Sequence, residues 1–155
     1  SGVLLINTLA WAQESVSAKA MSMLADKAIV SHLTYMDQDI LNLILLGKVK
    51  FIDAKYNTQF SLNYELKKSF VCPINDETVL IHYVGPTKPW HYWAGYPSAQ
   101  PFIKAKEASP WKNEPLMRPV NSNYARYCAK HNFKQNKPIN GIMNYIYYFY
   151  LKIIK

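Results

Sequence analysis

The stretch Thr78-Val79-Leu80-Ile81-His82-Tyr83-Val84 decides the fold, because it is apolar and rich in β-branched residues. It runs directly into Gly85-Pro86-Thr87-Lys88-Pro89, where one glycine and two prolines within five residues predict a sharp loop. We therefore expect a central β-strand that ends in a tight loop. In α/β folds, ligands collect beyond the carboxyl ends of such strands.

The flanking elements alternate between strand-like and helix-like patterns. Strands are predicted at residues 3–6 and 49–52, and helices at about 15–25, 37–46, 121–133 and 142–154. Residues 90–119 hold most of the prolines and tryptophans and should be irregular, and a turn is expected at 137–141. This alternation predicts an α/β fold.

Length and composition limit the class of protein. The chain has 155 residues, half of them hydrophobic, which suits one domain with a real core. It begins at Ser1 and enters an apolar run at once, so we expect an N-terminal part to be missing. Cys72 and Cys128 are far apart, which fits reduced thiols better than a disulfide framework or a zinc site. No secretory signal is visible, and no apolar run approaches the roughly 20 residues of a membrane span.

Positive charge is concentrated near the C-terminus. The net charge is +8, yet up to Glu114 there are 11 basic residues against 10 acidic ones. After Glu114 the chain has no acidic residue, and its basic residues are Arg118, Arg126, Lys130, Lys134, Lys137, Lys152 and Lys155. Such a segment suits a polyanion: an anionic membrane surface, a phosphorylated lipid or a nucleic acid.

Two groups of residues carry candidate chemistry. In Asp37-Gln38-Asp39, two carboxylates flank an amide at a helix start, where acidic residues are also common as simple N-caps. In the loop stretch, His82 offers an imidazole to a metal, Gly85 permits close backbone approach, and Lys88 suits a phosphate. The alternative interpretation is that His82 is a hydrogen-bonded core histidine and Lys88 a solvated lysine of the loop.

The order of these motifs resembles that of family 8 glycosyltransferases. The residues that carry the resemblance are Gly2-Val3-Leu4-Leu5-Ile6-Asn7, Trp11, Asp37-Gln38-Asp39-Ile40-Leu41-Asn42, Lys55-Tyr56-Asn57, the stretch from His82 to His91, and Ser109-Pro110-Trp111. The stretch from Tyr56 to Lys67 is similar to the enterobacterial lipopolysaccharide core α-1,3-glucosyl- and galactosyltransferases in particular.

The resemblance implies the C-terminal part of a GT-A (nucleotide-diphospho-sugar transferase) fold over residues 1–114, with a C-terminal helical extension over 115–155. The donor would be UDP-glucose or UDP-galactose, with Mn²⁺ or Mg²⁺ on its diphosphate. His82 matches the family's metal-binding histidine, and Gly85 and Lys88 match residues that contact the diphosphate. Asp37 matches a residue that binds donor-sugar hydroxyls, and Gln38 the residue that faces the anomeric carbon.

The resemblance also implies a departure from the family. The metal-binding Asp-x-Asp motif has no match here, because Asp37-Gln38-Asp39 corresponds to the sugar-binding motif. The metal aspartates should therefore lie outside this chain, and we expect the chain to be inactive alone. Gln38 is a neutral amide and a poor nucleophile, which favours a front-face route, in which the leaving phosphate deprotonates the acceptor hydroxyl, over a covalent intermediate.

The implied acceptor is a hexose of the lipopolysaccharide outer core, joined through an α-1,3 linkage. Trp90 and His91 are candidates to contact this acceptor, although aromatic residues of a loop also serve to pack it. The aromatic helix over 142–154 and the basic residues before it suit peripheral docking on the cytoplasmic face of the bacterial inner membrane. Glucose and galactose donors are not distinguished.

Two other functions use the same C-terminal segment. One is a non-catalytic membrane- or lipopolysaccharide-binding module, which needs the basic aromatic tail but no nucleotide sugar. The other is nucleic-acid binding, for which the chain has no recognised fold or base-reading motif, so we expect no nucleic-acid partner. Only the loop from His82 to Lys88 separates an enzyme from these alternatives.

Overall fold

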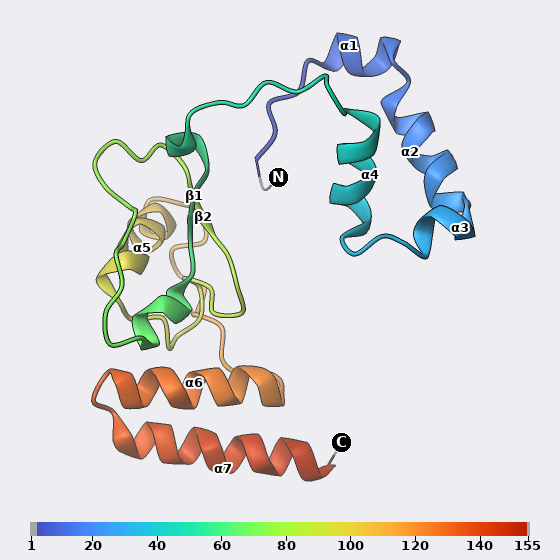
Figure 1. Cartoon of the computed structure of the whole chain (residues 1–155). Helices are drawn as coiled ribbons and strands as arrows, with labels where there is room; N and C mark the ends of the chain where they lie inside the picture. Colours follow the sequence, from blue (N-terminus) through green and yellow to red (C-terminus); the bar gives the residue numbers. More distant parts are fainter. Residues whose placement is uncertain (1–2, 155) are drawn as a thin grey trace. The chain divides into compact units, whose positions relative to one another are not determined.

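The computed structural model describes residues 3–154 and divides the chain into two compact units (Figure 1). The first unit ends at Ala54 and the second begins at Lys55. The motif residue Gly2 and the terminal Lys155 lie outside the described residues. The domain boundary between residues 114 and 115 stays a prediction, and each unit is described by itself below.

The first unit consists of short helices. They are α1 (Thr8–Gln13), α2 (Val16–Ala25), α3 (Lys27–Val30) and α4 (Met36–Ile44). The predicted helices at 15–25 and 37–46 are therefore confirmed. Gly47 lies three residues after the last residue of α4 and has a φ of +74°, a backbone conformation that glycine adopts without strain, so the turn after the helix uses it.

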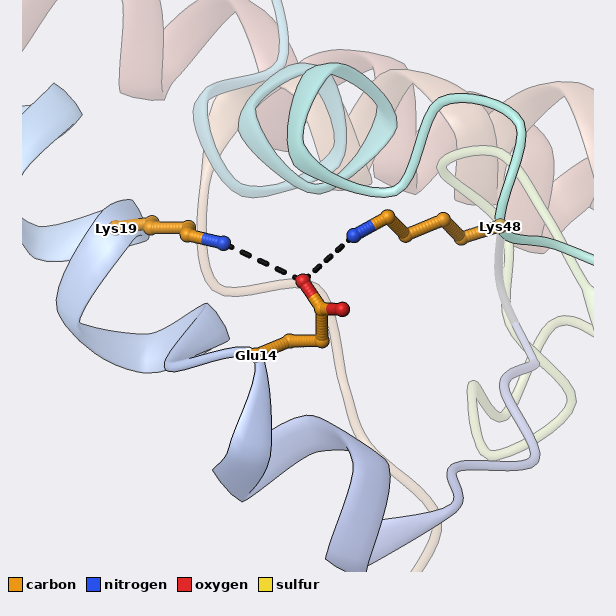
Figure 2. A network of polar contacts seen from close by, with 3 residues as sticks. All are labelled: Glu14, Lys19 and Lys48. Carbon is orange, nitrogen blue, oxygen red and sulfur yellow. Dashed lines mark hydrogen bonds and ion pairs between the residues drawn. The ribbon is translucent and has the colours of Figure 1, made fainter.

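A carboxylate joins two parts of the first unit. Glu14 follows α1, and its Oε2 atom accepts from Lys48 Nζ at 2.6 Å and lies 3.5 Å from Lys19 Nζ (Figure 2). The hydrogen bond and charge of Lys48, followed by those of Lys19, lower the pKa of Glu14. The contact links the residues after α4 to the junction of α1 and α2, and because it is solvent-exposed its contribution to stability is small.

The strands predicted at 3–6 and 49–52 are wrong. Neither segment forms a strand, and Leu5 and Phe51 are 91% and 92% exposed. A strand needs a neighbouring strand to satisfy its backbone hydrogen bonds. None of the described residues supplies that neighbour, and the side chains of Leu5 and Phe51 stay exposed.

The second unit contains a two-stranded parallel sheet. Strands β1 (Thr58–Phe60) and β2 (Ile81–Tyr83) pair so that Gln59 lies opposite His82. The strand predicted over 78–84 is thus confirmed for three residues, and among the described residues it has one neighbour rather than two. Strand β1, which sequence reasoning missed, is flanked by the 3₁₀ helices η1 (Ala54–Asn57) and η2 (Leu62–Leu66).

Helices complete the second unit. They are η3 (Pro97–Ala99), α5 (Gln100–Glu107), α6 (Ser122–Lys134) and α7 (Pro138–Ile154). Helix α6 confirms the prediction, and the side chain of Asn121 caps it by accepting from Tyr124 N at 2.8 Å. Two predictions need correction. Helix α5 lies within the segment 90–119 that was expected to be irregular, and α7 begins at Pro138, inside the expected turn.

Two apolar contacts hold the second unit together. Buried residues of β1, η2 and the segment before α5 form a core cluster: Phe60, Leu62, Ala94, Tyr96 and Ala99. Helices α6 and α7 run side by side and antiparallel (Figure 1). Gly141 permits this approach, because a Cβ atom there would lie 2.6 Å from the ring of Phe133.

Candidate functional site

The loop after β2 turns at a glycine that no other residue can replace without strain. Gly85 has a φ of +82°, in the left-handed region. A Cβ atom on Gly85 would lie 2.8 Å from Ser61 Oγ, closer than Cβ atoms approach other atoms. The loop therefore lies directly against the start of η2, and the backbone at Gly85 stays open to a ligand on its exposed side.

Lys88 folds back over the end of β2. Its Nζ atom donates to the carbonyl oxygen of Tyr83 at 2.6 Å and lies 6.0 Å from the centre of the Trp90 ring. Its backbone N–H donates to Nδ1 of His91 at 3.1 Å. These contacts hold a positive charge beside the carboxyl end of the strand, where a bound anion would meet it.

His82 lies in the middle of β2 and is half-buried. Its Nδ1 lies 3.1 Å from Oδ1 of Asn57, an oxygen that only accepts hydrogen bonds. A tautomer with the proton on Nδ1 fits this contact, and it leaves Nε2 free to bind a metal. Residues 3–154 contain no group of three His, Cys, Asp or Glu side chains that could hold a metal.

The acidic motif lies in the first turn of α4, in the other unit. Asp39 accepts from the backbone N–H groups of Thr34 and Tyr35, both at 2.8 Å, which confirms the capping interpretation for this carboxylate. Asp37 and Gln38 are exposed. The structure thus brings His82, Gly85 and Lys88 together in one unit, while Asp37 and Gln38 belong to the other.

The two acceptor candidates differ in exposure. Trp90 is 42% exposed and is open to a ligand. His91 is 1% exposed, and its ring stacks on Trp93 at 4.2 Å between centroids. Burial first, and then the charge of Lys88, lower the pKa of His91 to about 4. This burial argues against direct contact of His91 with an acceptor. His91 instead accepts a hydrogen bond from the backbone N–H of Lys88 and packs beneath the loop.

Sequence reasoning missed a buried network beneath the loop. Thr87 and His131, both fully buried, approach to 3.0 Å between Oγ1 and Nε2. The same Nε2 lies 3.1 Å from Asn63 Oδ1, and Nδ1 lies 2.7 Å from the hydroxyl of Tyr96. No local signal marks this network, because Thr87 stands between Pro86 and Lys88 in a loop while His131 stands in a helix of basic residues.

Acid should destabilise the second unit. Burial is the main cause that lowers the pKa of both His91 and His131 to about 4, against 6.5 for the free side chain. The folded state keeps both rings neutral. The free energy of unfolding therefore has its full value above pH 6.5 and decreases as the pH drops towards 4. Each ring contributes up to about 1.4 kcal/mol per pH unit in this window.

The measurement is the melting temperature between pH 7.5 and pH 4.5. We expect a steady decrease that begins below pH 6.5, and the same decrease in a His32→Ala control, since His32 is exposed. A melting temperature that stays constant down to pH 4.5 would contradict the neutral, buried state of these two histidines.

Comparisons with known proteins identify the family. The model of glycosyl transferase family 8 matches residues 1–94, and that of the family 8 C-terminal region matches residues 96–152. The chain is 54% identical over 154 residues to the lipopolysaccharide glucosyltransferase WaaO of Escherichia coli K12, covering 99% of this chain and 45% of that protein. It is 50% identical over 155 residues to the lipopolysaccharide 1,3-galactosyltransferase of Salmonella typhimurium LT2, covering 100% of this chain and 46% of that protein.

The chain spans about half the length of the curated relatives that it matches. No solved structure matches it significantly. The two family models together cover nearly every residue, and the loop from His82 to Lys88 lies within the first of them. The chain belongs to glycosyltransferase family 8.

Proposed function

We propose that this chain acts as the C-terminal half of a retaining transferase that moves a hexose from UDP-glucose or UDP-galactose to a hexose of the lipopolysaccharide outer core, through an α-1,3 linkage. The observation that carries this proposal is the loop after β2. There, Gly85 turns the backbone, Lys88 holds a charge beside the strand end, and His82 can offer Nε2 to a metal. Family membership and the names of the relatives support the same reaction.

Each residue of the loop has a role in donor binding. The ammonium of Lys88 would neutralise charge on the leaving diphosphate, and the backbone at Gly85 would approach it closely. His82 would supply one ligand to Mn²⁺ or Mg²⁺, which adds electrostatic stabilisation of the leaving group when bound. The carboxylates that complete the metal site would come from the other half of the enzyme.

Asp37 and Gln38 would act on the donor sugar. Both side chains are exposed in the first turn of α4, where backbone N–H groups favour an anionic residue. Asp37 would bind sugar hydroxyls, and Gln38 would face the anomeric carbon. Because an amide is a poor nucleophile, we favour a front-face route in which the leaving phosphate takes the proton of the acceptor hydroxyl.

Helix α7 supports a peripheral position at the inner membrane, on its cytoplasmic face. Its exposed apolar residues recur at helical spacing along one face: Ile139, Ile142, Met143, Ile146, Phe149, Tyr150 and Ile153. Basic residues of α6 and α7 would add attraction to anionic lipids or to the lipopolysaccharide acceptor. Within residues 3–154, no helix is long and apolar enough to cross a bilayer.

The proposal includes inactivity of this chain when it is alone. The uncovered apolar side chains at Leu5 and Phe51 would be buried by the other half, which would also supply strand neighbours.

Removal of the metal provides the first test of the proposed reaction. With Mn²⁺ present, the full-length protein should bind UDP with a micromolar Kd, of the order at which such enzymes bind their substrates, and EDTA should weaken this binding at least about tenfold.

A second candidate function is a non-catalytic membrane- or lipopolysaccharide-binding module, favoured by the exposed apolar face of α7. The same preparation distinguishes the two. Binding to anionic vesicles without any binding of UDP or UDP-hexose would support the module and contradict the transferase. Binding of UDP that EDTA weakens would support the transferase.

A further inference from the structure

The loop from Gly85 to Lys88 is fixed at two points, one on each side of its turn. On one side, Gly85 packs against Ser61, because a Cβ atom at Gly85 would lie 2.8 Å from Ser61 Oγ, and the N–H of the preceding Val84 donates to the carbonyl oxygen of Phe60 at 2.9 Å. On the other side, the hydroxyl of Thr87 reaches the imidazole of His131 at 3.0 Å, with both residues fully buried. The second point joins the loop to α6, because His131 lies 44 residues further along the chain than Thr87.

The hydrogen bonds of His131 form one consistent set. Nε2 lies 3.1 Å from Oδ1 of Asn63, which only accepts, and 3.0 Å from the hydroxyl of Thr87; the tautomer with the proton on Nε2 fits both contacts, which then share one N–H. Nδ1 then accepts from the hydroxyl of Tyr96 at 2.7 Å. A single imidazole therefore connects the loop, η2 and the segment before η3 by hydrogen bonds.

We propose that His131 and Thr87 are positioning residues that hold the loop, and with it Lys88, in the conformation that binds the diphosphate of the donor. This inference rests on the proposed function, because it takes the loop to be the diphosphate site. Neither residue can touch the donor, since both side chains are fully buried. Their effect passes through the backbone to Lys88, the neighbour of Thr87.

The chemistry of the network explains why it suits this role. Burial, followed by the charges of His91 and Lys130, lowers the pKa of His131 to about 4, so the ring is neutral at physiological pH and its Nδ1 remains an acceptor. A buried polar group that loses its partner costs far more than an exposed one. The network therefore favours the observed arrangement of the loop, and α6, from the region matched by the C-terminal family model, helps to define it.

The test uses Thr87→Val in the full-length transferase, because valine keeps the shape of threonine and removes only the hydroxyl. We expect the Kd for UDP with Mn²⁺, measured by calorimetry, and the KM for the donor to rise about three- to tenfold, as the binding conformation becomes less populated. At saturating donor, kcat should change less than about twofold, since bound donor restores the loop. Thr87→Ser, which keeps the hydroxyl, should restore wild-type binding.

A matched control separates positioning from general destabilisation. Asn132 is next to His131 in α6 and 2% exposed, and its side chain bonds to Cys128 O within the same helix at 2.9 Å. Asn132→Ala should lower the melting temperature without changing the Kd for UDP. The inference fails if Thr87→Val binds UDP like the wild type, or if Asn132→Ala weakens binding equally. If the wild type itself binds no UDP, the proposed function fails instead, and this inference with it.

Discussion

Replacing His82 by alanine is expected to lower kcat/KM for the UDP-hexose at least about 10²-fold in the full-length protein. The reason is the proposed metal contact: Nδ1 lies 3.1 Å from the accepting Oδ1 of Asn57, so Nε2 is the atom that would bind the metal and that alanine removes. Since His82 is half-buried in a two-stranded sheet, the fold should survive the change. The measurement is steady-state turnover with Mn²⁺ as the metal.

The control for this prediction is His32→Ala. Of the four histidines, His91 and His131 are buried supports of the loop, whereas His32 is exposed in the first unit. We expect His32→Ala to keep wild-type turnover and wild-type dependence on Mn²⁺. Full activity in His82→Ala would remove this histidine from the metal site.

Replacing Lys88 by methionine is expected to lower kcat/KM about 10²- to 10³-fold, the usual effect of removing one charge-stabilising group. Methionine keeps the length and apolar stem of lysine. The decrease in kcat/KM therefore measures the effect of the ammonium group, which lies 2.6 Å from the carbonyl oxygen of Tyr83. In the proposed reaction the charge would act on a diphosphate that leaves in the transition state, so kcat should fall as well as donor affinity.

Lys104→Met is the matched control for Lys88→Met. Lys104 lies on α5 in the same unit and is exposed. Because both variants replace one lysine by methionine, they change the net charge by the same amount. Lys104→Met should turn over UDP-hexose at the wild-type rate. An equal loss of activity in both variants would show that net charge, rather than the position of Lys88, controls the reaction.

Elements set by local pattern could be predicted from the sequence. Helices α2 and α4 follow from apolar residues at helical spacing, and Gly47 lies in the turn after α4 with a positive φ. Helix α6 follows from the cap at Asn121. In each case the interactions that define the element lie within a few residues of one another, so a short window of sequence contains them.

Elements set by distant partners could not be predicted. The apolar runs at 3–6 and 49–52 look like strands, yet a strand forms only against a neighbour, and no described residue provides one. Strand β1 has three residues, too few for a pattern to identify. Pro101 made the segment of α5 look irregular in sequence, although the first turn of a helix tolerates proline.

The candidate site shows the same division. His82, Gly85 and Lys88 are neighbours in sequence, and the turn at Gly85 keeps them together in space. His131 meets Thr87 across 44 residues, so no spacing rule could find it. The roles of Asp37 and Gln38 on the donor sugar, like those of His82, Gly85 and Lys88, stay predictions, and Asp37 and Gln38 belong to the other unit.

The most direct test of the transferase is the movement of a labelled hexose from UDP-glucose or UDP-galactose to lipopolysaccharide truncated in its outer core. The full-length protein is used with Mn²⁺, and the linkage of the product is determined. We predict transfer from one of the two donors, with the new bond in the α configuration. Folded protein that transfers neither hexose would contradict the proposed reaction and favour a binding module.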